Sequence, residues 1–153
     1  MTNLQGKRIW LTGASLGIGR GLAHELANQR AITVITSRNE DALDTVRKEV
    51  ENLGGKVLVK PGDVTDLERM KEIASEIESE LGGIDILIAN AGTHVFTNPE
   101  EFDTAEYLDL MNINYGGTLR CIEAVLPGML ARKSGRIVGI ASLAGLRGLP
   151  NAA

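Results

Sequence analysis

The sequence is poor in cysteine, in long apolar runs and in signals for export. Cys121 is the only cysteine among 153 residues, which excludes an internal disulfide framework and offers no set of metal ligands. No apolar stretch approaches the roughly 20 residues that a membrane-spanning helix needs. The first residues, MTNLQGKR, lack the apolar core of a secretion signal. These absences favour a cytoplasmic protein with no metal centre and no contact with membranes.

The sequence also has fewer positively charged than negatively charged residues. The chain has 16 lysines and arginines against 20 aspartates and glutamates, a net charge of -4. Without a positive excess, there is no reason to expect a nucleic acid or an anionic membrane as a partner. Apolar residues make up 43% and charged residues 24%, which is ordinary for a soluble globular protein. The length predicts one domain, covering residues 1–153.

Short β-rich runs alternate with amphipathic helical segments. The predicted strands are residues 7–12, 31–37, 56–60, 84–89 and 136–141. Helices are predicted after a glycine-rich turn, after Asn39 as N-cap, after a capping box from Thr65 to Glu68, and over about residues 103–132. This alternation predicts an α/β fold with a doubly wound parallel sheet, the Rossmann fold. Because the chain stops just after the fifth strand and its loop, we expect about five strands and a missing C-terminal part.

Three glycines form a turn between the first predicted strand and the first helix. Residues 12–19 read TGASLGIG, with Gly13, Gly17 and Gly19. The first can make a tight turn, the second lets the backbone approach a pyrophosphate, and the third lets helix and strand pack closely. The helix N-terminus offers N–H groups to the phosphates. A plain glycine-rich loop is the alternative, but the position between strand and helix favours a dinucleotide site. No Gly-Lys-Ser/Thr follows, which excludes a Walker loop.

The end of the second predicted strand bears on the choice of dinucleotide. A site for NAD would place Asp or Glu here, on the ribose 2′-hydroxyl, where it would repel a 2′-phosphate. The chain has Ser37 and Arg38 instead, a hydroxyl and a guanidinium that can bind phosphate. Glu40 and Asp41 fit the first turn of the next helix better. An ordinary solvated charge is the alternative for Arg38, but we expect NADP(H).

The spacing Thr-Gly-x-x-x-Gly-x-Gly resembles the turn of the classical branch of the short-chain dehydrogenase/reductase family. Four further segments match that family in order across essentially the whole chain: Asp63-Val64, Asn90-Ala91-Gly92, residues 114–117 and residues 135–142. In the family these surround the cofactor and the reacting carbon. By resemblance, the cofactor-binding residues are Gly13, Ser15, Leu16, Gly17, Ile18, Gly19, Ser37, Arg38, Asp63, Val64, Asn90, Ala91 and Gly92.

The resemblance also implies a chemistry. In the family a tyrosine exchanges a proton with the substrate oxygen while the cofactor exchanges a hydride with the carbon. A lysine lowers the pKa of that tyrosine, a serine donates a hydrogen bond to the reacting oxygen, and an asparagine supports a proton relay. Ser142 and Asn114 match the serine and the asparagine, although Asn112 competes for the latter role. The alternative for Ser142 is a small residue at a strand end, and the alternative for Asn114 is a helix residue that bonds locally. The implied activity is an NADP(H)-dependent oxidoreductase acting on a small carbonyl or alcohol compound.

The tyrosine and lysine of that family do not occur at the required spacing. Tyr107 is followed four residues later by Met111, and Tyr115 by Leu119, so neither makes Tyr-x-x-x-Lys. In the family this motif begins shortly after the serine, which here falls beyond the last residue. We therefore expect the chain as given to be inactive, and the full-length protein to be a homo-oligomer. The alternative is a non-catalytic dinucleotide-binding module, a sensor or scaffold. An extended-type epimerase or dehydratase is disfavoured, because its turn usually reads Thr-Gly-x-x-Gly-x-x-Gly.

Overall fold

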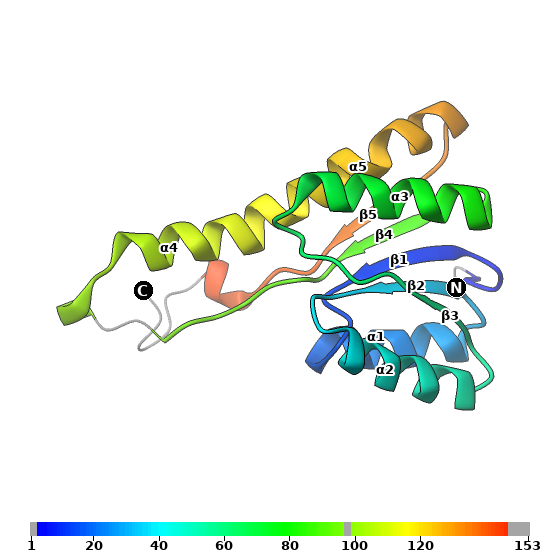
Figure 1. Cartoon of the computed structure of the whole chain (residues 1–153), viewed down its shortest axis with the longest axis horizontal. Helices are drawn as coiled ribbons and strands as arrows, with labels where there is room; N and C mark the ends of the chain where they lie inside the picture. The colour runs from blue at the N-terminus through cyan, green and yellow to red at the C-terminus, as the bar shows by residue number, and fades with distance from the viewer. Residues whose placement is uncertain (1–2, 97–98, 147–153) are drawn as a thin grey trace.

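Five parallel strands form one sheet at the centre of the described chain. The computed structural model describes residues 3–96 and 99–146. The strands are β1 (Arg8–Thr12), β2 (Ile32–Thr36), β3 (Lys56–Val59), β4 (Ile86–Ala89) and β5 (Arg136–Gly139). Their order is β3-β2-β1-β4-β5 (Figure 1). The five strands predicted from the sequence are confirmed, each shorter by one to two residues at one or both ends.

Helices cover both faces of this sheet. Helices α1 (Gly17–Asn28) and α2 (Glu40–Asn52) lie on one face, and α3 (Leu67–Leu81) and α5 (Gly117–Arg132) on the other (Figure 1). Successive strand residues point to opposite faces. Leu11 therefore joins the apolar cluster under α1 and α2, while its neighbour Trp10 joins the cluster under α3 and α5. The doubly wound α/β fold predicted from the alternating pattern is confirmed.

The long predicted helix is interrupted. Helix α4 (Thr104–Met111) begins after Asp103, whose carboxylate accepts the N–H of Ala105 at 2.9 Å. A π-helical turn (Asn112–Gly116) then joins α4 to α5. The predicted range of about residues 103–132 is confirmed, but apolar spacing gave no sign of the π-turn. The cysteine of this region, Cys121, is buried, and burial raises the pKa of its thiol to about 12.

Two helix caps show how far local pattern predicts structure. Asn39 caps α2 as predicted, with its Oδ1 accepting the N–H of Ala42 at 3.0 Å. The cap predicted at Thr65 is wrong by one residue, because Asp66 accepts the N–H of Arg69 at 3.0 Å and begins α3. The reason is a competing partner. Thr65 donates both its N–H and its hydroxyl to Asp63 Oδ1, each at 2.9 Å, and so stays outside the helix.

The strand order creates a crevice between β1 and β4. From β1 the chain winds outward through β2 to β3, and then returns through α3 to β4 on the other side of β1. The loops that follow β1 and β4 thus leave the sheet in opposite directions and open a crevice at its carboxyl edge, where doubly wound sheets bind ligands.

Within residues 3–96 and 99–146, no helix combines the length and apolarity needed to cross a membrane.

Candidate functional site

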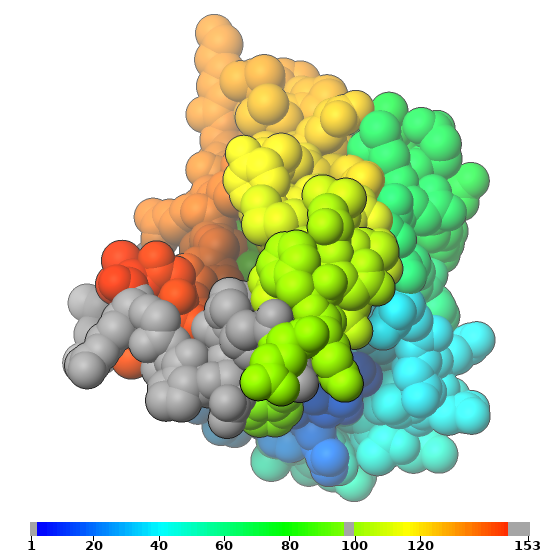
Figure 2. Space-filling view, turned by 90° about the vertical axis from the view of Figure 1, so that its left-hand side faces the viewer, coloured from blue at the N-terminus to red at the C-terminus, as the bar shows by residue number. Residues whose placement is uncertain are grey.

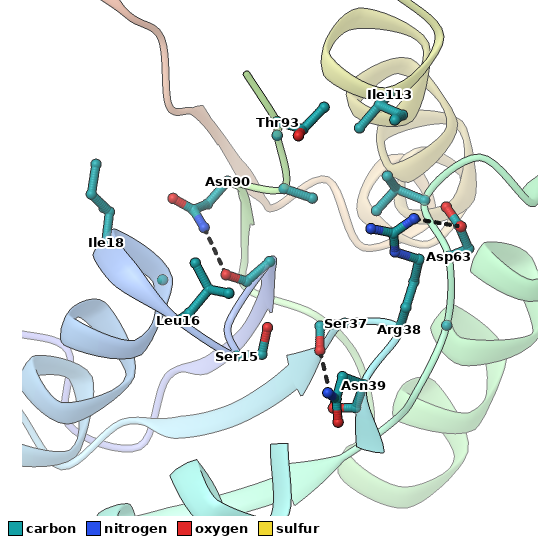
Figure 3. Close-up of a pocket in the computed structure, with 16 residues that line it drawn as sticks. Ser15, Leu16, Ile18, Ser37, Arg38, Asn39, Asp63, Asn90, Thr93 and Ile113 are labelled. Atoms are coloured by element: carbon teal, nitrogen blue, oxygen red, sulfur yellow. Dashed lines mark hydrogen bonds and ion pairs between the residues drawn. The ribbon is translucent and has the colours of Figure 1, made fainter. Parts of the chain in front are cut away.

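A cavity of about 500 Å³ lies at this carboxyl edge, against the loops after β1, β2, β3 and β4. All the residues predicted to bind the cofactor line it except Gly17 (Figure 3). Four more lining residues were not predicted, namely Asn39, Gly62, Thr93 and Ile113. Each lies within one residue of a predicted one, with Asn39 beside Arg38 and Ile113 beside Asn114, so adjacency was the available signal.

The glycine turn has the backbone that its sequence requires. Gly13 and Gly17 have φ values of +66° and +53°, in the left-handed region that favours glycine. A Cβ on Gly19 would lie 2.1 Å from the carbonyl oxygen of Gly13, so the start of α1 packs directly on the turn. A Cβ on Gly17 would meet no described atom within 4 Å. The turn is therefore closely packed at Gly19, whereas Gly17, which does not line the cavity, has free space at its Cβ position.

Helix α1 begins with its backbone N–H groups available. Helices α2, α3 and α4 start with a side chain that accepts one of these N–H groups, from Asn39, Asp66 and Asp103. At α1 the N-cap is Leu16, no described side chain caps the helix, and the first turn has no acidic residue. Because Leu16 lines the cavity, the positive end of the helix dipole faces it. This arrangement can bind an anion such as a phosphate.

Thr12 and Asn90 join the loop after β1 to the loop after β4. The Thr12 hydroxyl is buried and accepts the N–H groups of Asn90 and Ala91, both at 3.1 Å. The side-chain amide of Asn90 donates back to the carbonyl oxygen of Thr12 at 3.0 Å. It also donates to that of Gly13 at 3.1 Å (Figure 3). These bonds hold the glycine turn against β4. The sequence motif includes Thr12 only as the residue before Gly13, and it did not predict this role. A hydroxyl next to the glycine turn was the signal that could have indicated it.

Hydroxyl and guanidinium groups gather at the end of the cavity beside β2. Ser15, Ser37 and Arg38 all lie there (Figure 3). The Arg38 side chain is 74% exposed, and its Nη1 lies 3.9 Å from Asp63 Oδ2. One ion pair this long engages few of the five N–H donors of a guanidinium. This end of the cavity can therefore bind a second anionic group.

Asn114 reaches the cavity through Thr93. Its Oδ1 accepts the Thr93 N–H at 2.7 Å, and its Nδ2 donates to the Thr93 carbonyl at 3.0 Å. The alternative of purely local bonding within the helix is wrong for this side chain, because Thr93 lies 21 residues away. The competing residue Asn112 accepts instead from Arg120 Nη2 at 2.8 Å. The structure thus directs Asn114, and not Asn112, toward a residue that lines the cavity.

Ser142 follows β5 at the same carboxyl edge but does not line the cavity. It precedes a short 3-10 turn (Leu143–Gly145), and its Oγ accepts the N–H of Ala144 at 3.1 Å. Tyr107 and Tyr115 are also absent from the lining residues. Tyr107 stacks on Phe102 with ring centroids 4.7 Å apart, and Tyr115 is 60% exposed. No group of three or more metal-ligating side chains occurs in the described part of the chain.

Comparison with known proteins assigns this architecture to a family. The family model described as short chain dehydrogenase matches residues 7–153. A ketoacyl reductase from Nostoc sp. is 37% identical over 149 residues, covering 97% of this chain and 52% of that protein. The crystal structure of actinorhodin polyketide ketoreductase with NADPH matches with a TM-score of 0.91 and 30% identity, covering 99% of this chain and 59% of that one. A metagenomic short-chain oxidoreductase in complex with NADP matches with a TM-score of 0.90 and 31% identity, covering 99% and 69%. The chain spans about half the length of the curated relatives it matches, 52% and 48% in two cases.

Proposed function

The chain belongs to the short-chain dehydrogenase family, and we propose that it serves an NADP(H)-dependent oxidoreductase that interconverts a carbonyl and an alcohol. Residues 1–153 would form its dinucleotide-binding domain. The observation that carries the choice of cofactor is the position of Ser37 and Arg38 at the cavity, where an NAD site would carry an acid. Two similar solved structures contain NADPH or NADP, which supports the same choice.

In this proposal, the lining residues would bind successive parts of the cofactor along the cavity. The glycine turn and the uncapped start of α1 would hold the pyrophosphate. Asp63 and Val64 would lie beside the adenine, and Asn90 to Gly92 would form the wall nearer the nicotinamide. When bound, NADP(H) supplies or accepts the hydride. The chain's own residues bind the cofactor and orient it.

Arg38 would discriminate between the two dinucleotides. The 2′-phosphate of NADP carries negative charge that a guanidinium can pair with bidentately, while the hydroxyls of Ser15 and Ser37 donate to its oxygens. Hydrogen bonds to charged groups contribute about 1.5–3 kcal/mol. A single such contact therefore accounts for a preference of roughly tenfold to a hundredfold for NADPH over NADH.

Ser142 and Asn114 would serve the reacting end of the site. The Ser142 Oγ accepts one hydrogen bond, which leaves its O–H proton to donate to the substrate oxygen. Asn114 is held on Thr93 at the cavity wall. A non-catalytic binding module would have no use for this pair. The name of the ketoacyl relative and that of the polyketide ketoreductase favour a carbonyl on an acyl chain as the substrate. Because the 153 residues contain no Tyr-x-x-x-Lys, we expect this chain to bind NADPH without turning over a carbonyl substrate.

Fluorescence titration with NADPH and NADH tests the proposal. We expect NADPH to bind at least about tenfold more tightly, and Arg38→Asp to weaken NADPH binding by roughly tenfold to a hundredfold with little effect on NADH. Lys48→Asp is the matched control, because Lys48 is an exposed cation on α2 that does not line the cavity. It should leave both affinities unchanged. Equal affinity for the two cofactors, or an unchanged ratio in Arg38→Asp, would contradict the assignment.

A further inference from the structure

We propose that Arg120 is a positioning residue, which braces the π-turn and so keeps Asn114 hydrogen-bonded to Thr93 on the wall of the cavity. The inference rests on the proposed function in one respect, that Asn114 serves the reacting end of the site. Arg120 itself does not line the cavity. Its effect would pass through the backbone of the turn.

The guanidinium of Arg120 grips the first residue of the π-turn at two points. Its Nη1 donates to the Asn112 carbonyl oxygen at 3.2 Å, and its Nη2 donates to Asn112 Oδ1 at 2.8 Å. Gly116 leaves room for this contact, because a Cβ there would lie 2.7 Å from Arg120 Nη1. The brace therefore spans the whole turn, from α5 back to its first residue.

The π-turn decides which residues face the cavity. A π-turn contains one residue more than an α-turn, and an α-helix rotates by about 100° per residue. Relaxation to a regular α-helix would therefore rotate α4 and the start of the turn relative to α5. In the structure Ile113 lines the cavity and Asn114 bonds to Thr93, while Tyr115 is 60% exposed. Figure 2 shows this part of the chain, in lime to yellow, at the molecular surface.

The two helices that flank the turn are held very differently. Helix α5 is anchored on the sheet, since Cys121 and Val125 are buried and a Cβ on Gly117 would lie 2.6 Å from Val64 Cγ2. In α4, all of whose residues the structure describes, none is buried. Packing therefore sets the orientation of α5 but contributes little to that of α4. A local contact has to hold the register across the turn, and Arg120 on Asn112 is a charge-assisted one.

Thr118 makes a second local contact, but of a weaker kind. Its hydroxyl donates to the Asn114 carbonyl oxygen at 3.0 Å. A threonine that bonds four residues back is common in helices and does not distinguish a π-turn from an α-turn. Arg120 reaches eight residues back, which a regular helix does not require, and its charge strengthens both bonds. The brace is therefore assigned to Arg120.

Hydrogen exchange of the Thr93 amide tests the brace in the 153-residue chain, because this N–H donates to Asn114 Oδ1. In Arg120→Met we expect exchange at Thr93 to be about tenfold faster, while the amides of β1 keep their wild-type rates. Asn112→Ala removes only the Oδ1 acceptor and keeps the carbonyl oxygen, so it should increase the exchange rate at Thr93 by less. If Arg120→Met does not fold, the exchange rate in Asn112→Ala tests the proposal instead. Arg47→Met is the matched control, since Arg47 pairs with Asp44 and Glu51 on α2, and it should leave Thr93 unchanged.

Unchanged exchange at Thr93 in Arg120→Met overturns the proposal. So does an equal rise at Thr93 and throughout β1, which would mean that Arg120 only stabilises the whole fold. A second measurement compares binding of NADPH with that of 2′-phospho-ADP-ribose, which lacks the nicotinamide. Arg120→Met should weaken NADPH more than this probe, and equal weakening would overturn the link to the reacting end. If the wild-type chain binds no NADPH, the proposed function fails, and exchange at Thr93 still decides the role of Arg120.

Discussion

Thr12 and Asn90 bond to each other reciprocally across the crevice between β1 and β4. The Thr12 hydroxyl accepts the Asn90 N–H at 3.1 Å, and the Asn90 side-chain amide donates to the Thr12 carbonyl at 3.0 Å. The same hydroxyl also accepts the N–H of Ala91. One buried oxygen therefore satisfies two backbone donors and fixes the distance between the glycine turn and the opposite wall of the cavity.

Replacing the Thr12 hydroxyl should lower the free energy of unfolding substantially, because this one oxygen accepts two hydrogen bonds. Thr12→Val keeps the shape but leaves the N–H groups of Asn90 and Ala91 without their acceptor, and an unsatisfied buried donor costs about 1–3 kcal/mol. We expect the free energy of unfolding to fall by about 2 kcal/mol, with weaker NADPH binding. Thr12→Ser retains the hydroxyl and is the control. Urea unfolding measures both variants, and equal losses in the two would contradict this role of the hydroxyl.

Two glycines of α1 should respond to alanine with opposite signs. A Cβ on Gly19 would lie 2.1 Å from the Gly13 carbonyl oxygen, so Gly19→Ala forces the helix away from the turn and should destabilise the protein by about 1–3 kcal/mol. A Cβ on Gly21 meets no described atom within 4 Å. Gly21→Ala should therefore stabilise the protein by about 0.5–1 kcal/mol through helix propensity. Thermal unfolding compares them, and changes of the same sign would count against the close contact at Gly19.

The ion pair between Arg8 and Asp85, at the amino edge of the sheet, should make the free energy of unfolding depend on pH at acidic values. Arg8 donates to Asp85 through Nη2 at 2.6 Å and Nε at 2.9 Å, which lowers the pKa of Asp85 from 3.8 to about 2. Because the pKa is lower in the folded than in the unfolded state, this stabilisation is complete above about pH 5 and is lost as the pH falls toward 2.

Asp85→Asn should remove this dependence of stability on pH, because asparagine has no carboxylate to protonate. Allowing for partial solvent screening, we expect the variant to be about 1 kcal/mol less stable than the wild type at pH 7. The difference should narrow steadily between pH 5 and pH 2, because the wild-type carboxylate becomes protonated. Urea unfolding at a series of pH values measures it. A difference that stays constant across this range would show that the Asp85 charge is not responsible.

Local signals in the sequence predicted the elements well. Asn39 caps its helix because acceptor and donor lie three residues apart, and the strands follow from β-branched runs. The prediction failed at Thr65 for a related reason, since Asp63 offered a nearby competing acceptor that a capping pattern does not include. The glycine spacing indicated the family, which the match over residues 7–153 confirms.

The sequence by itself determined the alternation of strands and helices, the glycine turn and the absence of an acid after β2, because each depends on residues close together in the chain. Only the tertiary structure decided that Asn114, and not Asn112, bonds to Thr93 on the cavity wall, and that Thr12 holds Asn90. These contacts join residues 21 and 78 positions apart. The first depends on a π-turn that changes helical register by one residue, and the second on a strand order that brings β1 beside β4. Neither the register nor the pairing is encoded in a local pattern, so both had to be found in the folded chain.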